Sequence, residues 1–230
     1  MKRSAFTLIE LLAVIAVIGI LVAILIPVIG SVREQAHQAT CTSNVRQLSA
    51  AYLLMMSDNN NMLIPGIKAG EGGNVPESKW WDNERTETWN MALDRYMHDG
   101  DRFNRLNDIN CPVALEAMGG EPSERSSYGF NHYIGKTTNP DNPNNGFRGA
   151  MRIEQLADPG RTIMFGDTAL SGSGKNTFQN LGSNTIFAWH GDHANISYFD
   201  GSVGTITIEE AEAKRPNTDE GYIFWRGVRR

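Results

Sequence analysis

Cysteine is scarce in this sequence, in which Cys41 and Cys111 are the only two among 230 residues. Two thiols are too few for a disulfide-rich scaffold or for a zinc site built from four cysteines. They suffice for one disulfide if this part of the chain lies outside the cytosol. The cysteine content therefore leaves two alternatives, a single crosslink or a pair of buried free thiols.

Positive charge is also in deficit, with 21 Lys and Arg against 26 Asp and Glu and a net charge of -5. Non-specific nucleic-acid binding depends on cations that contact phosphates, so we expect no nucleic-acid partner. The one local basic cluster, Arg226, Arg229 and Arg230, is interpreted as a solvated tail.

Motifs of catalysis are missing as well. Residues 172–176, Gly-Ser-Gly-Lys-Asn, lack the earlier glycine of a phosphate loop and the Ser or Thr that follows its Lys. A Gly-x-Ser-x-Gly nucleophile elbow does not occur. We therefore expect a protein that is not an enzyme and that carries no cofactor.

One long apolar run, by contrast, extends from Phe6 to Ile29 and carries a single charge, Glu10. Its 24 residues rise about 1.5 Å each as a helix, which is enough to cross a hydrocarbon core of about 30 Å. Lys2 and Arg3 precede the run, and the positive-inside rule places them in the cytoplasm. We therefore expect one membrane span, with the rest of the chain on the outer side.

Glu10 is the informative residue of this run. A carboxylate at membrane depth costs several kcal/mol unless it meets a partner or water. A lone anchor gains nothing from that cost, whereas an assembling helix gains if a neighbouring chain supplies a cation. Cleavage before Phe6 would create such a cation, a new α-amino group. An ordinary uncleaved anchor is the alternative.

Residues 5–12, Ala-Phe-Thr-Leu-Ile-Glu-Leu-Leu, resemble the cleavage and methylation motif of type IV pilins and type II secretion pseudopilins. The resemblance implies a leader over residues 1–5, cleavage between Ala5 and Phe6 by prepilin peptidase, and methylation of the Phe6 amine. It makes Glu10 the fifth mature residue and assigns it to assembly. Pro27 resembles the family's proline that softens the helix, because it removes one helix hydrogen bond. Ala5 departs from the family, which usually has Gly there.

The helix is expected to continue beyond the membrane. Cys41, Val45, Leu48, Tyr52 and Met55 recur at spacings of 4, 3, 4 and 3, which is one face of an amphipathic helix. Residues 58–61, Asp-Asn-Asn-Asn, favour turns over helix interiors. We therefore divide the chain into a span over 6–29, an amphipathic helix over 30–57 and a globular head over 58–230.

Residues 41–48 also resemble a large group of pilin-like proteins with this long helix, and Cys111-Pro112 resembles that group's second cysteine position. The resemblance implies a disulfide between Cys41 and Cys111, with two buried free thiols as the alternative. Between these positions, Trp80 and Trp81 form either a ligand surface, for example for a glycan, or part of a small core. Residues 137–149 and 171–184 are predicted to be loops, and Arg161–Gly166 a strand.

The strongest local signal of the head is a hairpin. Residues 194–199 and 202–208 are β-prone runs joined by Asp200-Gly201, and this dipeptide suits a type I′ turn with two positive φ angles. His190 stands ten residues before Asp200, and this His-x9-Asp-Gly pattern over 190–208 resembles a C-terminal domain named for that spacing, H-X9-DG. The domain occurs in many proteins with prepilin-type leaders.

Histidine and aspartate in the same region raise the question of a metal. His190, Asp192 and His193 offer imidazole and carboxylate ligands, but His-x-x-His is a weak signal by itself. A structural histidine that caps the hairpin is the favoured interpretation, so we expect no metal and keep these three residues as weak candidates.

Together these features predict an α+β pilin-like fold, in which a long helix packs on a small antiparallel sheet with long loops. The resemblance implies a structural subunit that self-associates into a type IV pilus or a type II secretion pseudopilus. Its partners would be prepilin peptidase, the inner-membrane assembly platform and membrane lipid. It would sit in the bacterial inner membrane with a periplasmic head before it joins the filament. A membrane-anchored metal- or glycan-binding domain is the alternative.

Overall fold

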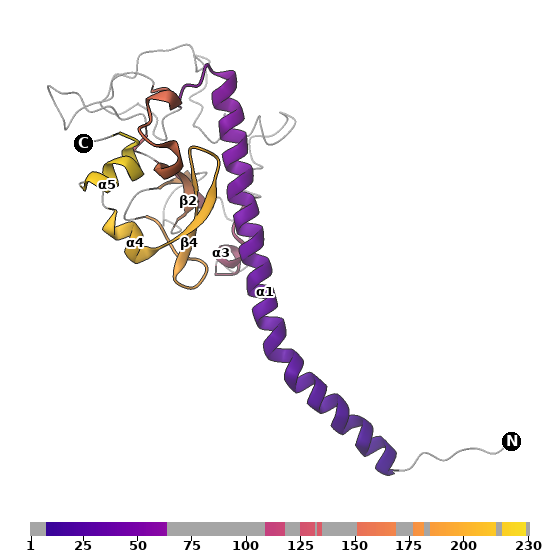
Figure 1. Ribbon diagram of the computed structural model, residues 1–230. Coiled ribbons are helices and arrows are strands. Elements are labelled where there is room, and N and C mark those ends of the chain that lie inside the picture. The colour runs from indigo at the N-terminus through magenta and orange to yellow at the C-terminus, as the bar shows by residue number, and fades with distance from the viewer. Residues whose placement is uncertain are drawn as a thin grey trace. The chain divides into compact units, whose positions relative to one another are not determined.

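The computed structural model describes residues 8–63, 109–117, 125–131, 133–134, 151–168, 177–181, 185–214 and 218–228 (Figure 1). The helices are α1 (Leu8–Asp58), α3 (Pro112–Ala117), α4 (Ile208–Ala213), α5 (Asp219–Gly221), the 3-10 turns η2 (Ile153–Gln155) and η3 (Pro159–Arg161), and the π-helical η4 (Tyr222–Arg226). The strands are β1 (Arg125–Asn131), β2 (Ile163–Asp167), β3 (Thr177–Leu181), β4 (His193–Tyr198) and β5 (Val203–Thr207). Contacts divide the chain into two compact units, Met1–Ala39 and Thr40–Arg230.

In the first unit, the described residues belong to α1. This helix is long and apolar enough to cross a membrane, and its best window has a mean hydropathy of 3.3 and no buried residues. Its large apolar side chains from Leu8 to Val32 are all exposed. Pro27 lies inside the helix. The apolar surface runs around the whole helix, as expected for a segment surrounded by lipid or by other helices.

In the second unit, the remainder of α1 packs against a sheet. Cys41, Val45, Leu48, Tyr52 and Met55 are all buried, which confirms the predicted stripe. The Tyr52 ring lies 4.8 Å from the ring of Phe130 on β1 and 5.9 Å from that of Phe165 on β2, measured between centroids. Aromatic pairs at such separations stabilise a fold beyond the effect of the apolar area that they bury. The stripe is therefore the helix's contribution to the main core.

The helix ends where the sequence predicts. Asn60 and Asn61 have φ angles of 55° and 60°, a left-handed conformation that Asn tolerates better than most residues. The Asn61 N–H donates to the Met56 carbonyl at 2.9 Å, and the Asn59 side chain donates to the Met55 carbonyl at 2.6 Å. These bonds satisfy carbonyls that the last helical turn leaves without an intrahelical donor.

The five strands form one sheet in the order β3-β1-β2-β4-β5. The pairs β1–β2, β2–β4 and β4–β5 are antiparallel, so the predicted α+β class and antiparallel sheet are confirmed. β3 pairs parallel with β1 and lies within 171–184, the segment that the sequence predicts to be a loop. The loop prediction is therefore wrong for Thr177–Leu181. Pairing with β1 supplies the hydrogen bonds of this short strand.

Two layers cover β4 within this unit. Asn195 accepts a hydrogen bond at 3.0 Å from the Thr42 hydroxyl of α1, whereas Ala194 and Ile196 belong to a second core with Ala211 of α4 and Trp225 of η4. Thr207 and Glu210 form a capping box that starts α4, each side chain accepting from the other's backbone N–H at 3.1 Å. The sheet is thus enclosed by α1 and by the C-terminal helices.

The C-terminal segment is packed rather than solvated at Arg226. The guanidinium of Arg226 lies 5.7 Å from the ring centroid of Tyr133 and 5.0 Å from that of Tyr222. Cation–π contacts of this kind hold an arginine against aromatic faces. The interpretation of Arg226 as part of a solvated tail is therefore wrong, while Arg229 and Arg230 lie outside the described residues.

The hairpin strands are confirmed, with His193 opposite Thr207 and Ser197 opposite Val203. The predicted type I′ turn is wrong, because Gly201 has a positive φ of 86° and Asp200 does not. The Gly201 N–H donates to the Tyr198 carbonyl, and the Tyr198 N–H donates to the Ser202 carbonyl. This is a three-residue loop with glycine in its left-handed position, which is the next most common way to close a hairpin.

Candidate functional site

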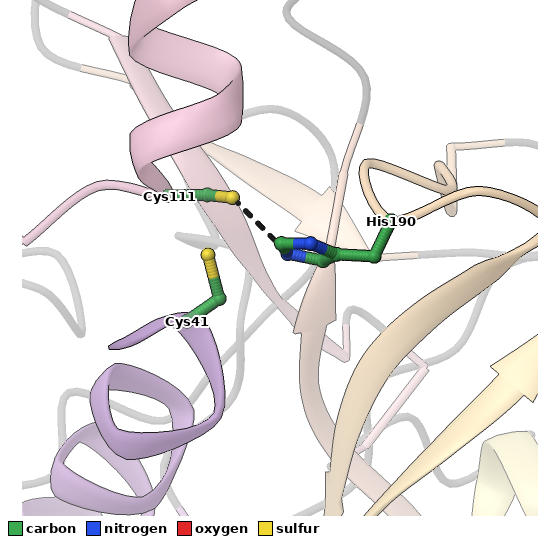
Figure 2. Close-up of side chains that lie close together, drawn as sticks. All are labelled: Cys41, Cys111 and His190. Carbon is green, nitrogen blue, oxygen red and sulfur yellow. Dashed lines mark hydrogen bonds between the residues drawn. The ribbon is translucent and has the colours of Figure 1, made fainter. Parts of the chain in front are cut away.

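Three residues far apart in the sequence meet inside the head. Cys41 comes from α1, Cys111 lies immediately before α3, and His190 lies in the segment before β4 (Figure 2). Their Sγ and imidazole nitrogen atoms all lie within 4.8 Å of one another, and all three residues are buried. Cys111 Sγ and His190 Nε2 form a hydrogen bond of 3.3 Å. We call these three residues the Cys-Cys-His cluster.

Cys111 is held in place by β1. Its backbone N–H donates to the Ser127 hydroxyl at 2.7 Å, and the Ser127 N–H donates to the Asn110 side chain at 2.9 Å. The Asn44 side chain of α1 donates to the Asn110 carbonyl at 3.1 Å. The segment that carries Cys111 is therefore fixed both to the sheet and to the helix that carries Cys41.

His190 is positioned by a tight turn. Gly191, directly after it, has a φ of 70°, a conformation that favours glycine. The His193 N–H then donates to the His190 carbonyl at 3.4 Å, and residues 190 and 193 form an isolated antiparallel bridge. The turn thus brings the imidazole into the core while β4 begins.

The two thiols do not ionise independently. The hydrogen bond between them is the largest influence on each: it lowers the pKa of Cys111 and raises that of Cys41. Burial raises both pKa values, and His190 lowers that of Cys111 through a hydrogen bond. Two thiolates so close together in an apolar interior repel each other, so the pair favours one negative charge.

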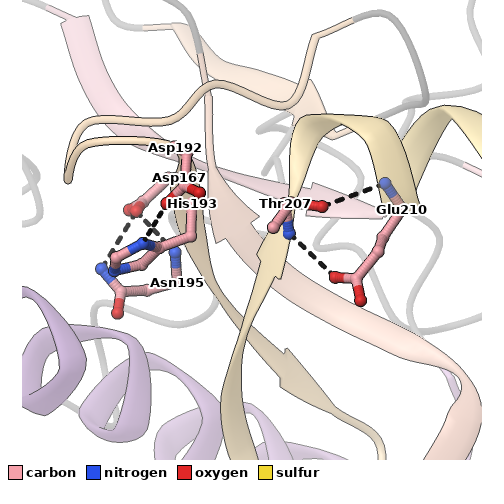
Figure 3. A network of polar contacts seen from close by, with 6 residues as sticks. All are labelled: Asp167, Asp192, His193, Asn195, Thr207 and Glu210. Carbon is pink, nitrogen blue, oxygen red and sulfur yellow. Dashed lines mark hydrogen bonds and ion pairs between the residues drawn. The ribbon is translucent and has the colours of Figure 1, made fainter.

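Asp167, at the end of β2, is a second buried ionisable group (Figure 3). Its Oδ2 accepts from the Asn195 N–H at 2.7 Å and from the Asn195 side-chain amide at 3.1 Å. Its Oδ1 has no hydrogen-bond partner among the described residues. Burial raises the pKa of Asp167 to about 7, and the charges of Cys111 and His190 act on it in opposite directions.

The three weak metal candidates from the sequence separate in the structure. Asp192 and His193 form a pair with 3.0 Å between Asp192 Oδ1 and His193 Nδ1 (Figure 3). The Asp192 side chain is exposed and that of His193 is partly buried, whereas His190 is buried. Over the described ranges, the Cys-Cys-His cluster is the one group of three or more potential ligands that comes this close. The sequence predicts a crosslink between the cysteines, with two buried free thiols as the alternative, and a histidine that caps the hairpin. No local spacing connects positions 41, 111 and 190.

Asp200 and Gly201 have a different structural role from His190. Asp200 Oδ1 accepts from the Ser202 N–H at 2.9 Å and from the Ser202 hydroxyl at 2.6 Å, which closes the hairpin loop. A Cβ on Gly201 would lie 3.2 Å from Leu53 Cδ1 of α1, so the loop approaches the helix closely. The described contacts therefore assign His190 to the buried cluster and the Asp-Gly pair to the loop.

Both cysteines are free thiols in the structure, and the crosslink between Cys41 and Cys111 stays a prediction. Glu10 and Pro27 lie on α1. Ala5, Phe6, Trp80 and Trp81 lie outside the described residues, as does the loop over 137–149.

Comparison with known proteins identifies the N-terminal part. Residues 1–26 match the family described as a prokaryotic N-terminal methylation motif. The chain is also 34% identical over 112 residues to the type IV narrow pilus major component PilA5 of Thermus thermophilus. That match covers 97% of the relative and 46% of this chain. The chain belongs to the type IV pilin family.

This pilin has more sequence than its relative, because the match leaves more than half of the chain without a counterpart. No solved structure matches the chain. The resemblance to the H-X9-DG domain stays a prediction.

Proposed function

We propose that this pilin is a filament subunit that assembles laterally through α1, with its head on the outer surface. The observation that carries the proposal is the exposure of apolar side chains from Leu8 to Val32, on every side of the helix. Such a surface is stable in lipid, or against the same helix of other subunits. Both environments are needed by a subunit that leaves the membrane to enter a filament.

Glu10 supplies the register of this assembly. It lies in the first turn of α1, two residues after Leu8, whose side chain is 82% exposed. A carboxylate buried among apolar helices is costly unless it meets a cation. The methylated amine of Phe6 in a neighbouring subunit is a cation at the right end of the helix. Pairing with it would favour one axial offset between neighbouring helices over the others.

The test is Glu10→Leu, with Glu34→Leu as the matched control at an exposed position of the same unit. We expect the Glu10→Leu subunit to enter the membrane at the normal level and to form few filaments. Glu34→Leu should assemble normally, because Glu34 lies beyond the predicted span. Assembly of Glu10→Leu at the normal rate would overturn the pairing, and equal loss in both variants would assign the effect to net charge.

Processing follows the same proposal. Prepilin peptidase would remove residues 1–5 and leave N-methylated Phe6, with the N-terminus cytoplasmic and the head periplasmic before assembly. The inner-membrane assembly platform would then extract the subunit from the lipid. Mass spectrometry of the mature N-terminus tests the cleavage site, and an intact Met1 would contradict it. Electron microscopy of the cell surface separates a long pilus from a short periplasmic pseudopilus.

A further inference from the structure

The Cys-Cys-His cluster has the donor set of a metal site. We infer that Cys41 Sγ, Cys111 Sγ and His190 Nε2 bind a Zn²⁺ ion inside the head. Zinc takes thiolate and imidazole ligands in tetrahedral geometry, with Zn–S near 2.3 Å and Zn–N near 2.0–2.1 Å. The inference concerns the unit Thr40–Arg230 alone and does not depend on how the apolar part of α1 assembles.

The distances fit such an ion. In a tetrahedral site of those bond lengths, neighbouring ligand atoms lie roughly 3.5–3.8 Å apart. The structure gives 3.3 Å between Cys111 Sγ and His190 Nε2, and no two ligand atoms of the cluster are more than 4.8 Å apart. Shifts of a few tenths of an ångström at the Cys111–His190 contact would bring that pair to the coordination distance.

Burial and charge favour a cation over thiols alone. Cys41 and Cys111 have no exposed surface, and His190 is 3% exposed. Without an ion the buried pair favours at most one negative charge, whereas a divalent ion balances the charge of two thiolates. Zinc binding releases the thiol protons. Because the unfolded chain has no preformed site, the free energy of binding adds to the stability of the fold. The ion would join α1, the start of α3 and the turn before β4.

A disulfide competes for the same two sulfur atoms. It would place them about 2.05 Å apart and leave His190 without a role in the linkage. The imidazole nitrogen instead faces Cys111 Sγ (Figure 2). Three converging donors are accounted for by a metal ion, and only two of them by a crosslink. The fourth coordination position would go to water, as in other zinc sites with three protein ligands.

The decisive experiment uses the full chain in detergent, purified anaerobically without chelator or added thiol. Elemental analysis should find about one zinc per chain, and two thiols should titrate after unfolding. Replacement of zinc by Co²⁺ should give the visible absorption of tetrahedral cobalt and the thiolate-to-cobalt charge-transfer band. A cysteine-linked peptide with substoichiometric zinc would overturn the site and establish the crosslink that the sequence predicts.

His190→Ala separates the two states, with His193→Ala as the matched control three residues away on a more exposed side chain. For a metal site, His190→Ala should lower zinc affinity at least about tenfold, while His193→Ala binds normally. Equal zinc affinity in both variants would overturn the proposal. If His190→Ala does not fold, the cobalt spectrum of the unaltered chain still decides, because absence of the charge-transfer band excludes thiolate ligation.

Discussion

The two parts of α1 share one secondary structure and differ in how their apolar side chains are distributed around the helix. From Leu8 to Val32 the large apolar side chains are 47% to 82% exposed, whereas from Cys41 to Met56 the apolar stripe is at most 5% exposed. The first part is apolar on all sides and the second on one. A helix apolar on all sides requires lipid or other chains, while a striped helix completes its burial within its own head.

The largest expected effect on the stability of the head comes from Leu→Ala in the second part of α1, with the same substitution in the first part as its control. Leu48→Ala removes a fully buried side chain and should destabilise the head by about 2–5 kcal/mol. Leu21→Ala removes one that is 58% exposed and should leave the unfolding of the head unchanged. Urea unfolding in detergent, followed by tryptophan fluorescence, measures both. Equal destabilisation by the two variants would contradict the distinction between the two parts of α1.

A charge in the first part of α1 should impair membrane insertion and leave the stability of the head unchanged. Ile18→Lys places an ammonium near the middle of the predicted span and should cost about 2.5–3.5 kcal/mol of insertion. We expect less protein in the membrane fraction, and a head that unfolds at the same urea concentration as the unaltered protein. A shift of that midpoint would show that the head depends on the span for its stability.

A smaller effect is expected at the hairpin loop that approaches the second part of α1. Gly201→Ala forces a φ of 86° on alanine and places its Cβ 3.2 Å from Leu53 Cδ1, so it should cost roughly 1–2 kcal/mol. Gly204→Ala is the matched control, since a Cβ there meets nothing within 4 Å. Thermal unfolding compares the two, and equal melting temperatures would contradict the strain.

The smallest effect should come from Leu54, which lies in the second part of α1 but off the stripe and is 59% exposed. Leu54→Ala should change the stability of the head by no more than about 0.5 kcal/mol. Urea unfolding checks this value against that of Leu48→Ala. A loss as large as that of Leu48→Ala would mean that exposure does not distinguish the faces of this helix.

Local patterns in the sequence carried much of the fold. The apolar run, the stripe from Cys41 to Met55 and the asparagines after Asp58 predicted a long helix and its end to within one residue. Two β-prone runs joined by Asp200-Gly201 predicted β4 and β5. The predicted type I′ turn is wrong, because Asp-Gly is compatible with several loops and the hydrogen bonds between Tyr198 and both Gly201 and Ser202 select one.

The elements whose signals are local follow from the sequence alone: the long apolar helix, the stripe and the hairpin strands. That Thr177–Leu181 is a strand follows from the tertiary structure, because parallel pairing with β1 supplies hydrogen bonds that the composition of this segment does not predict. The tertiary structure also decided that His190 meets Cys41 and Cys111 and not Asp192 and His193. Periodicity reports which face of an element is buried, whereas the meeting of positions 41, 111 and 190 depends on how the chain between them folds.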